Sequence, residues 1–131
     1  MRILRAADVP LVPASHENPL APGVWKKVLL QRADLQPGTV QMINWARLPV
    51  DHRFAAHYHE DMQEIFILVQ GEAEMTVAGQ TAVLGRGDAI AIDPREVHAM
   101  RNLGNEEVEY VVVGITAGQG GKTVVVEEIA N

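Results

Sequence analysis

The sequence predicts an all-β fold in which ten short strands form a closed barrel or two packed sheets. From Val24 onward, runs rich in Val, Ile, Thr and aromatic residues are separated by Gly, Pro, Asp or Asn at intervals of roughly 8 to 12 residues. No long segment has the 3.6-residue period of an amphipathic helix. Ten strands in about 108 residues favour a closed or double-sheet architecture, because such folds leave few strand edges exposed.

The first five expected strands cover residues 24–31, 39–48, 53–59, 64–70 and 72–78. Each is rich in the β-branched, aromatic or other apolar residues that pack well on a pleated surface. A Pro-Gly pair reverses the chain after the first strand, a polar stretch separates the third from the fourth, and a glycine ends the fourth.

The last five expected strands cover residues 80–84, 88–92, 97–102, 108–116 and 123–129. The turns before them contain Ala-Gly, Gly-Arg-Gly, Asp-Pro-Arg-Glu and Gly-Asn, which are residue types that tolerate tight backbone reversals. The strand pattern therefore continues nearly to the end of the printed sequence.

The first 23 residues differ from the rest, because they contain four of the seven prolines. Each proline disfavours helix at the residue before it, so this segment is expected to be extended. We therefore predict an N-terminal arm over residues 1–23 and one barrel domain over residues 24–131.

Composition limits the classes of partner. Hydrophobic residues make up 47% and charged residues 21% of the 131 residues, as in an average globular domain. The net charge of -6 and the scattered basic residues argue against a nucleic-acid partner. The N-terminal apolar run is interrupted by Asp8 and Pro10, and no segment has the length of a membrane span, so we expect no membrane partner and a cytoplasmic location. Cysteine is absent, so any metal must be held by His, Asp or Glu.

The stretch HYHEDMQEIFILVQG, residues 57–71, places three metal-ligand types at the head of an apolar strand. Side chains two residues apart in a strand point to the same face, so His57 and His59 project together. Glu64 is expected to return to them through a hairpin and to open a strand that is buried on both faces. A buried carboxylate is costly unless a partner offsets its charge.

A fourth ligand type lies in GDAIAIDPREVHAMRN, residues 87–102, where His98 begins a strand. Three imidazoles and one carboxylate suit a divalent transition ion such as Mn, Fe, Co, Ni, Cu or Zn. Four protein ligands on an octahedral ion would leave two positions for a small molecule, which is typical of a working site rather than a closed structural one.

These two stretches resemble the two sequence motifs of the cupin superfamily. The resemblance implies a small single-domain double-stranded β-helix, or jelly-roll barrel, of two antiparallel sheets. It also implies one metal ion held by His57, His59, Glu64 and His98, and commonly a homodimer. The sequence departs from the motifs at Asp51 and Arg95, where glycine is usual, and at Asp93, where proline is usual. These departures affect turns and not ligands.

Two functions remain open. The first is a metal-dependent enzyme with dioxygenase-, isomerase- or decarboxylase-like activity on a small polar molecule, which the short chain with no second domain favours. The second is a non-catalytic sensor or binding module for a small ligand. Phe66 and Met100 share strand faces with the expected ligands and are candidates for a substrate pocket, whereas His16 and His52 fit neither motif and are expected in loops or on the surface.

Overall fold

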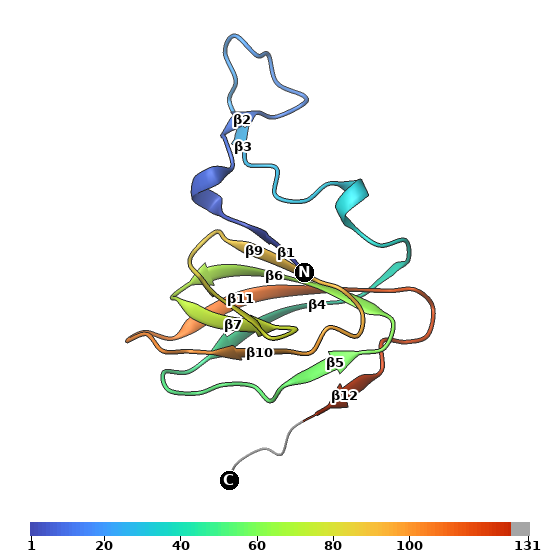
Figure 1. Ribbon diagram of the computed structural model, residues 1–131. Coiled ribbons are helices and arrows are strands. Elements are labelled where there is room, and N and C mark those ends of the chain that lie inside the picture. The colour runs from blue at the N-terminus through green and yellow to red at the C-terminus, as the bar shows by residue number, and fades with distance from the viewer. Residues whose placement is uncertain (127–131) are drawn as a thin grey trace.

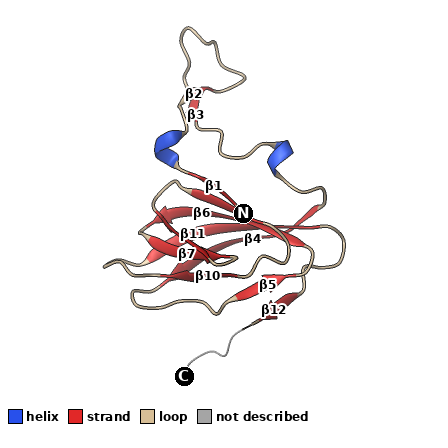
Figure 2. Ribbon diagram, viewed as in Figure 1, coloured by secondary structure: helices blue, strands red, loops and turns tan. Residues whose placement is uncertain are grey.

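Strands make up most of the regular structure in the computed structural model, which describes residues 1–126 (Figures 1 and 2). The ladders between these strands are all antiparallel. Two 3-10 helices, η1 and η2, are the only helices of this part of the chain. In chain order the elements are β1 (Arg2–Leu4), η1 (Ala6–Asp8), β2 (Val12–Pro13), β3 (Trp25–Lys26), η2 (Arg32–Asp34), β4 (Thr39–Leu48), β5 (His57–His59), β6 (Met62–Gln70), β7 (Ala73–Val77), β8 (Gln80–Leu84), β9 (Ala89–Ile92), β10 (His98–Arg101), β11 (Val108–Thr116) and β12 (Thr123–Val125).

Two five-stranded sheets enclose the core. The first sheet has the strand order β1-β9-β6-β11-β4 and the second has the order β12-β5-β10-β7-β8. Side chains alternate along β7 between buried and half-buried, because only one face of that strand meets the core. The core cluster between the sheets contains mainly aliphatic side chains with Phe66 and two methionines, Met75 and Met100. The predicted all-β barrel of two antiparallel sheets is confirmed.

Strand β6 is the wall that carries the glutamate of the first motif. Glu64, Phe66 and Leu68 are buried on the inner face of this strand. On the outer face, Ile65 is also buried, and Leu30 and Leu35 pack against its hydrophobic cluster. Burial on both faces of β6 was predicted, and the segment before β4 supplies the outer cover.

The expected hairpin between His59 and Glu64 is wrong. Strand β5 belongs to the second sheet and β6 to the first, so the chain crosses from one sheet to the other between residues 59 and 62. The Asp61 side chain holds this corner by accepting hydrogen bonds from the backbone N–H groups of Gln119 and Gly121, at 2.6 and 2.7 Å. A corner between sheets still turns Glu64 towards the histidines, because both sheets face the same interior.

Two differences concern the N-terminal half of the chain. The strand expected over residues 24–31 is confined to β3, because Leu30 packs onto the outer face of the first sheet instead of joining a ladder. Strand β1, which was not expected, pairs with β9, and β2 pairs with β3 in a small hairpin that projects from the barrel (Figure 1). The proposed division at residue 23 stays a prediction. The part of the strand expected over 123–129 that follows residue 126 lies outside the described residues.

The two positions at which the motifs usually have glycine keep a left-handed backbone in this chain. Asp51 has φ of 65° and Arg95 has φ of 69°. The backbone N–H of Arg95 donates to the carbonyl of His59 at 2.8 Å, so this turn is tied to a strand of the site. The sequence departures therefore leave the turn shape in place, at the cost of strain in a non-glycine residue.

Arg95→Gly is expected to stabilise the protein by about 0.5 to 1 kcal/mol, which corresponds to a rise in Tm of about 2 to 4 °C. Glycine removes the left-handed strain, and the greater freedom of glycine in the unfolded chain offsets part of the gain. Differential scanning calorimetry measures the change. Arg86→Gly is the control, because Arg86 is also an exposed turn residue but is not among the residues with positive φ, so that change should lower Tm.

No helix in residues 1–126 is long and apolar enough to cross a membrane.

Candidate metal centre

The four residues of the two motifs meet inside the barrel. His57 and His59 come from β5, Glu64 comes from β6 in the opposite sheet, and His98 is the first residue of β10. His98 pairs directly with His57 in the ladder between β10 and β5. One ligand atom from each of the four side chains lies within 4.8 Å of the others. The structure thus brings together all four residues that the sequence singled out, and their role as ligands stays a prediction.

Backbone carbonyls fix the tautomer of two of the histidines. The Nδ1 atom of His57 is 2.7 Å from the carbonyl oxygen of Ala55, and Nδ1 of His98 is 2.9 Å from that of Glu96. A carbonyl oxygen only accepts hydrogen bonds, so each Nδ1 carries a proton, and Nε2 is the ring nitrogen that remains for a metal ion. This arrangement is typical of metal-binding histidines, in which a second partner orients the ring.

The Glu64 carboxylate lies close to the Nε2 atoms of two histidines. Its Oε1 atom lies 3.0 Å from Nε2 of His98 and 2.7 Å from Nε2 of His59. The contact between Nε2 of His98 and Glu64 has hydrogen-bond geometry, whereas the buried Nε2 of His59 has no hydrogen-bond partner among the described residues. Lone pairs and a carboxylate that face one another need a cation or a proton between them. This donor set therefore fits a divalent metal ion.

Titration favours the metal-binding form of the cluster. Burial raises the pKa of Glu64, but the close contacts of His59 and His98 outweigh it and hold that pKa at about 2. Burial is the main cause that lowers the pKa of His57. Near neutral pH the cluster consequently offers an anionic oxygen and a neutral imidazole at His57, which is the form that transition metals bind.

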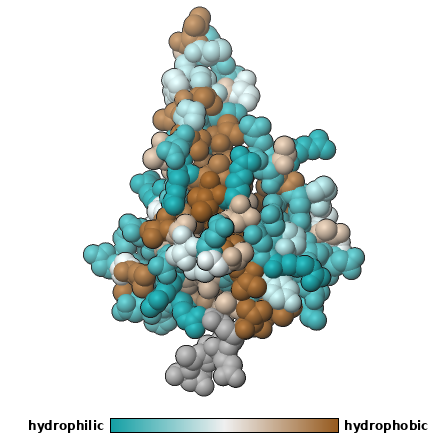
Figure 3. Space-filling view, in the orientation of Figure 1, coloured by the Kyte–Doolittle hydropathy of each residue, from teal (hydrophilic) through white to brown (hydrophobic). Residues whose placement is uncertain are grey.

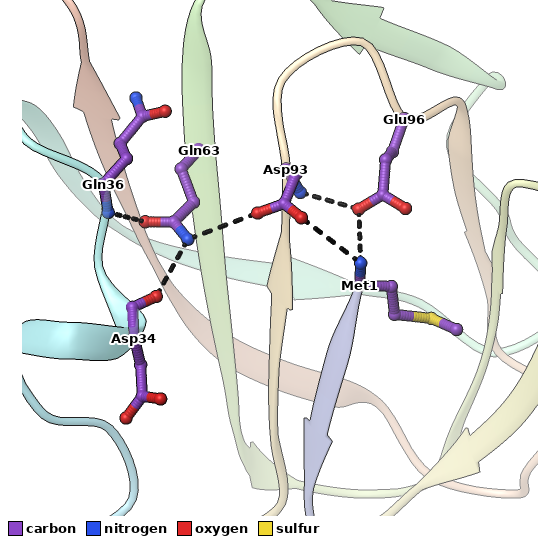
Figure 4. A network of polar contacts seen from close by, with 6 residues as sticks. All are labelled: Met1, Asp34, Gln36, Gln63, Asp93 and Glu96. Atoms are coloured by element: carbon purple, nitrogen blue, oxygen red, sulfur yellow. Dashed lines mark hydrogen bonds and ion pairs between the residues drawn. The ribbon is translucent and has the colours of Figure 1, made fainter.

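A second layer of contacts holds the turn that orients His98. The backbone carbonyl of Glu96 accepts a hydrogen bond from Nδ1 of His98. The side-chain Oε1 of the same residue accepts one from the backbone N–H of Asp93 at 2.8 Å. The buried side chain of Gln63 contacts the Asp93 carboxylate at 3.4 Å and also joins the backbone at Asp34 and Gln36 (Figure 4). Asp93 and Glu96 are thus parts of a structural network beside the ligand cluster.

Thr123 orients the remaining histidine, and sequence reasoning missed it. Its Oγ1 lies 3.0 Å from Nδ1 of His59, and the two residues are paired in the ladder between β12 and β5. This contact turns the unpartnered Nε2 of His59 towards Glu64. The pairing joins residues that are far apart in the sequence, so no local pattern reveals it.

Thr123→Val should weaken metal binding by about tenfold to a hundredfold with little change in fold, because valine keeps the shape and loses the contact with His59. Isothermal titration of the metal-free chain measures the affinity. Thr81→Val is the matched control: Thr81 has a similar hydroxyl contact, with Thr76 at 3.1 Å, in the exposed ladder between β7 and β8. Equal affinities for the two variants would contradict the orienting role.

Aromatic rings line one side of the cluster. The ring centroids of Phe66 and His98 are 6.0 Å apart, and those of Phe54 and His57 are 5.2 Å apart. Tyr110 follows at 5.4 Å from Phe66, and both burial and the Glu64 charge raise the pKa of its phenol. The sequence did not indicate Phe54 or Tyr110, because only the three-dimensional fold brings Phe54 next to His57 and Tyr110 next to Phe66.

The other sequence candidates have different surroundings. Met100 is completely buried in the core cluster, and its place in a substrate pocket stays a prediction. His16 and His52 are exposed and lie outside the cluster, as expected. A hollow of about 890 Å³ around residues 69–72, 85–86 and 103–106 lies at the ends of β6 and β10 that are far from the candidate ligands. Among the four candidate ligands, His57 is half-buried and the other three are buried.

Comparisons with known proteins agree with the fold. The family model described as "Cupin domain" matches residues 44–114. The chain is 29% identical over 76 residues to an uncharacterized protein of Methanocaldococcus jannaschii and 30% identical over 67 residues to an oxalate-binding protein of Thermotoga maritima. These matches cover 58% and 51% of this chain, and 61% and 55% of the two relatives. The chain thus spans less than two thirds of the length of either relative.

Among solved structures, a double-stranded β-helix protein from Klebsiella pneumoniae subsp. pneumoniae is similar, with a TM-score of 0.60. The two share 22% sequence identity, and the match covers 70% of this chain and 84% of the other. At this identity the likeness concerns the fold alone.

Proposed function

This chain belongs to the cupin family, and on that basis we propose that it binds one divalent transition metal ion through His57, His59, Glu64 and His98 and acts as a metal-dependent enzyme on a small polar molecule. Dioxygenase-, isomerase- and decarboxylase-like reactions are all compatible with such a site. The observation that carries the proposal is the cluster itself: four ligand atoms within 4.8 Å, with two imidazoles turned by backbone carbonyls so that Nε2 faces inward.

The residues around the proposed ion have separable roles. A bound metal would supply Lewis-acid or redox chemistry, and the ligand set does not decide between Mn, Fe, Co, Ni, Cu and Zn. Glu64 neutralises part of the ion's charge, and the rings of Phe54 and Phe66 exclude water from one side. Tyr110 keeps its proton near neutral pH and is a hydrogen-bond donor for an oxygen of the small molecule.

A second function has one observation in its favour. The relative from Thermotoga maritima is named an oxalate-binding protein, so a small carboxylate is a reasonable first ligand for this chain. Under this alternative the barrel holds the ligand at the metal and performs no reaction. We also propose that the protein is a homodimer, as the family resemblance implies.

Metal binding is tested on purified, untagged protein. Metal analysis should find one ion per chain after reconstitution, and excess metal should raise Tm by about 10 °C or more, since binding at a thousand times Kd contributes about 4 kcal/mol. His57→Ala should lose most of this rise. An unchanged Tm and no bound ion after reconstitution would refute the ligand assignment.

Catalysis is tested with the same loaded protein. Oxygen uptake with phenols, diketones, thiols and small carboxylates, with product analysis for isomerisation and decarboxylation, distinguishes the two functions. Turnover that disappears in His57→Ala supports the enzyme. Stoichiometric binding of a carboxylate without any product supports the binding module.

A further inference from the structure

The hairpin that projects from the barrel carries apolar side chains into solvent. This projecting hairpin, residues 10–28, includes β2 and β3 and extends away from the first sheet (Figure 1). Leu20 is 93% exposed and Trp25 is 54% exposed, and Leu11, Val24 and Val28 are exposed as well. Hydrophobic residues appear along this projection from its tip down to the barrel (Figure 3). Such a concentration of apolar surface on one small element marks an interaction site.

In a single chain the projecting hairpin is held mainly by hydrogen bonds within itself, such as the one from the Ala14 N–H to the Val24 carbonyl at 3.0 Å. Its ladder consists of two residue pairs, Val12 with Lys26 and Pro13 with Trp25. The Lys26 ammonium donates to Ser15 Oγ at 2.8 Å, within the hairpin, and the Lys27 ammonium donates to the carbonyl of Ala6 at its base. A two-stranded hairpin is marginally stable in water unless it packs against another surface.

A second apolar surface lies on β4. Val40, Ile43 and Trp45, here called the β4 strip, are paired with outward-facing residues of β11, and a bulge between Gly114 and Ile115 keeps all three on the outer face. Ile43 is 68% and Trp45 is 62% exposed. Strand β4 also ends its sheet, so one of its two edges has no ladder partner in the described residues. Exposed apolar edge strands are usually covered in natural proteins.

The cover of the first sheet stops short of this strip. Leu30 and Leu35 pack on the outer face over Ile65, Ala91 and Ile115, which belong to β6, β9 and β11. The same face continues onto β4, where the strip remains exposed. A further apolar segment laid beside Leu30 and Leu35 would extend an existing hydrophobic layer.

We propose that the projecting hairpin of one copy packs on the β4 strip of a second copy, and that a two-fold axis repeats the contact. A two-fold arrangement satisfies both exposed surfaces of both chains at once. The hairpin and strip together approach the roughly 20 to 30 residues a side of a stable interface, and tryptophan is a common anchor in such interfaces. Charge agrees, since Lys26 and Lys27 directly follow Trp25, whereas Glu109 accepts a hydrogen bond from Trp45.

The proposal rests on the homodimer proposed above and is independent of metal binding. Sedimentation equilibrium of the full chain should show a dimer. Trp25→Glu and Trp45→Glu should each raise the dimer dissociation constant by at least about thirtyfold. Val83→Glu is the control, because Val83 is half-exposed on β8, outside both surfaces, and should leave the constant unchanged. A monomeric wild-type chain, or a Trp45→Glu variant as dimeric as the control, would overturn the proposal.

Cross-linking identifies the contact without relying on loss of binding. The chain contains no cysteine, so thiols introduced by Trp25→Cys and Ile43→Cys are unique in each variant. A disulfide-linked dimer should form on oxidation of the mixed variants and not in either variant alone. Cross-linking of Trp25→Cys with itself would indicate contact between two hairpins and would refute the exchange. Metal content, measured on the same samples, is expected to be one ion per chain throughout, so failure of the metal proposal shows separately.

Discussion

Glu64→Gln is expected to lower the affinity for a divalent metal by more than about a hundredfold while leaving the barrel folded. Glutamine has nearly the same size as glutamate but no negative charge, and Glu64 is the only acidic member of the cluster. Its amide can donate a proton to Nε2 of His98 or His59, at the positions that are 3.0 and 2.7 Å from Oε1 in the native chain. The variant therefore keeps a hydrogen-bond partner for these nitrogens but loses the anionic ligand.

Isothermal titration with Mn and Zn, at fixed pH and ionic strength, measures this loss. The matched control is Glu72→Gln, because Glu72 is an exposed residue between β6 and β7 at the other end of the barrel. Circular dichroism should show the same strand signal for both variants. If Glu64→Gln binds the metal as tightly as Glu72→Gln, the carboxylate is not a ligand.

The ligand cluster was predictable because most of its information is local. The alternation of side chains along a strand places His57 and His59 on one face whatever the rest of the fold does. Glu64 and His98 followed from their positions in two motifs with defined spacing. The error concerned the path between His59 and Glu64, because a short polar connection in the sequence serves equally well as a hairpin or as a corner between two sheets.

The surroundings of the cluster could not be predicted in the same way. Thr123 reaches His59 through a ladder between distant segments, and Phe54 and Tyr110 reach His57 and Phe66 through packing. Likewise, the apolar run over residues 24–31 has a strand-like composition, yet Leu30 is used to cover the outer face of the first sheet. The apolar character of a residue predicts that it is buried. The side chains that it packs against depend on the whole topology.

The turns illustrate the opposite case, in which a departure from the motif does not change the shape. Asp51 and Arg95 replace glycines, and both keep a positive φ. Hydrogen bonds from the backbone N–H groups of these residues, to Asn102 and His59, hold the turns in place. Neighbouring contacts thus override the preference of the individual residue.

Acidification is expected to destabilise the metal-free protein in two steps. Burial lowers the pKa of His57, so the unfolded chain takes up a proton below about pH 6.5 before the folded chain does, and stability begins to fall there. Glu64 has a pKa of about 2 in the folded chain against an ordinary value of 4.5. Its stabilising contribution is therefore complete above pH 4.5 and is lost as the pH falls through about 2.

The gap between these two Glu64 values corresponds to about 3 kcal/mol of unfolding free energy. Urea unfolding of the metal-free wild type and of Glu64→Gln, at a series of pH values from 7 to 2.5, measures it. The free energies of the two proteins should converge or cross as the pH falls below 4.5, because glutamine does not titrate. Parallel curves over this range would mean that Glu64 is not held ionised by His59 and His98, and the electrostatic basis of the metal centre would fail with it.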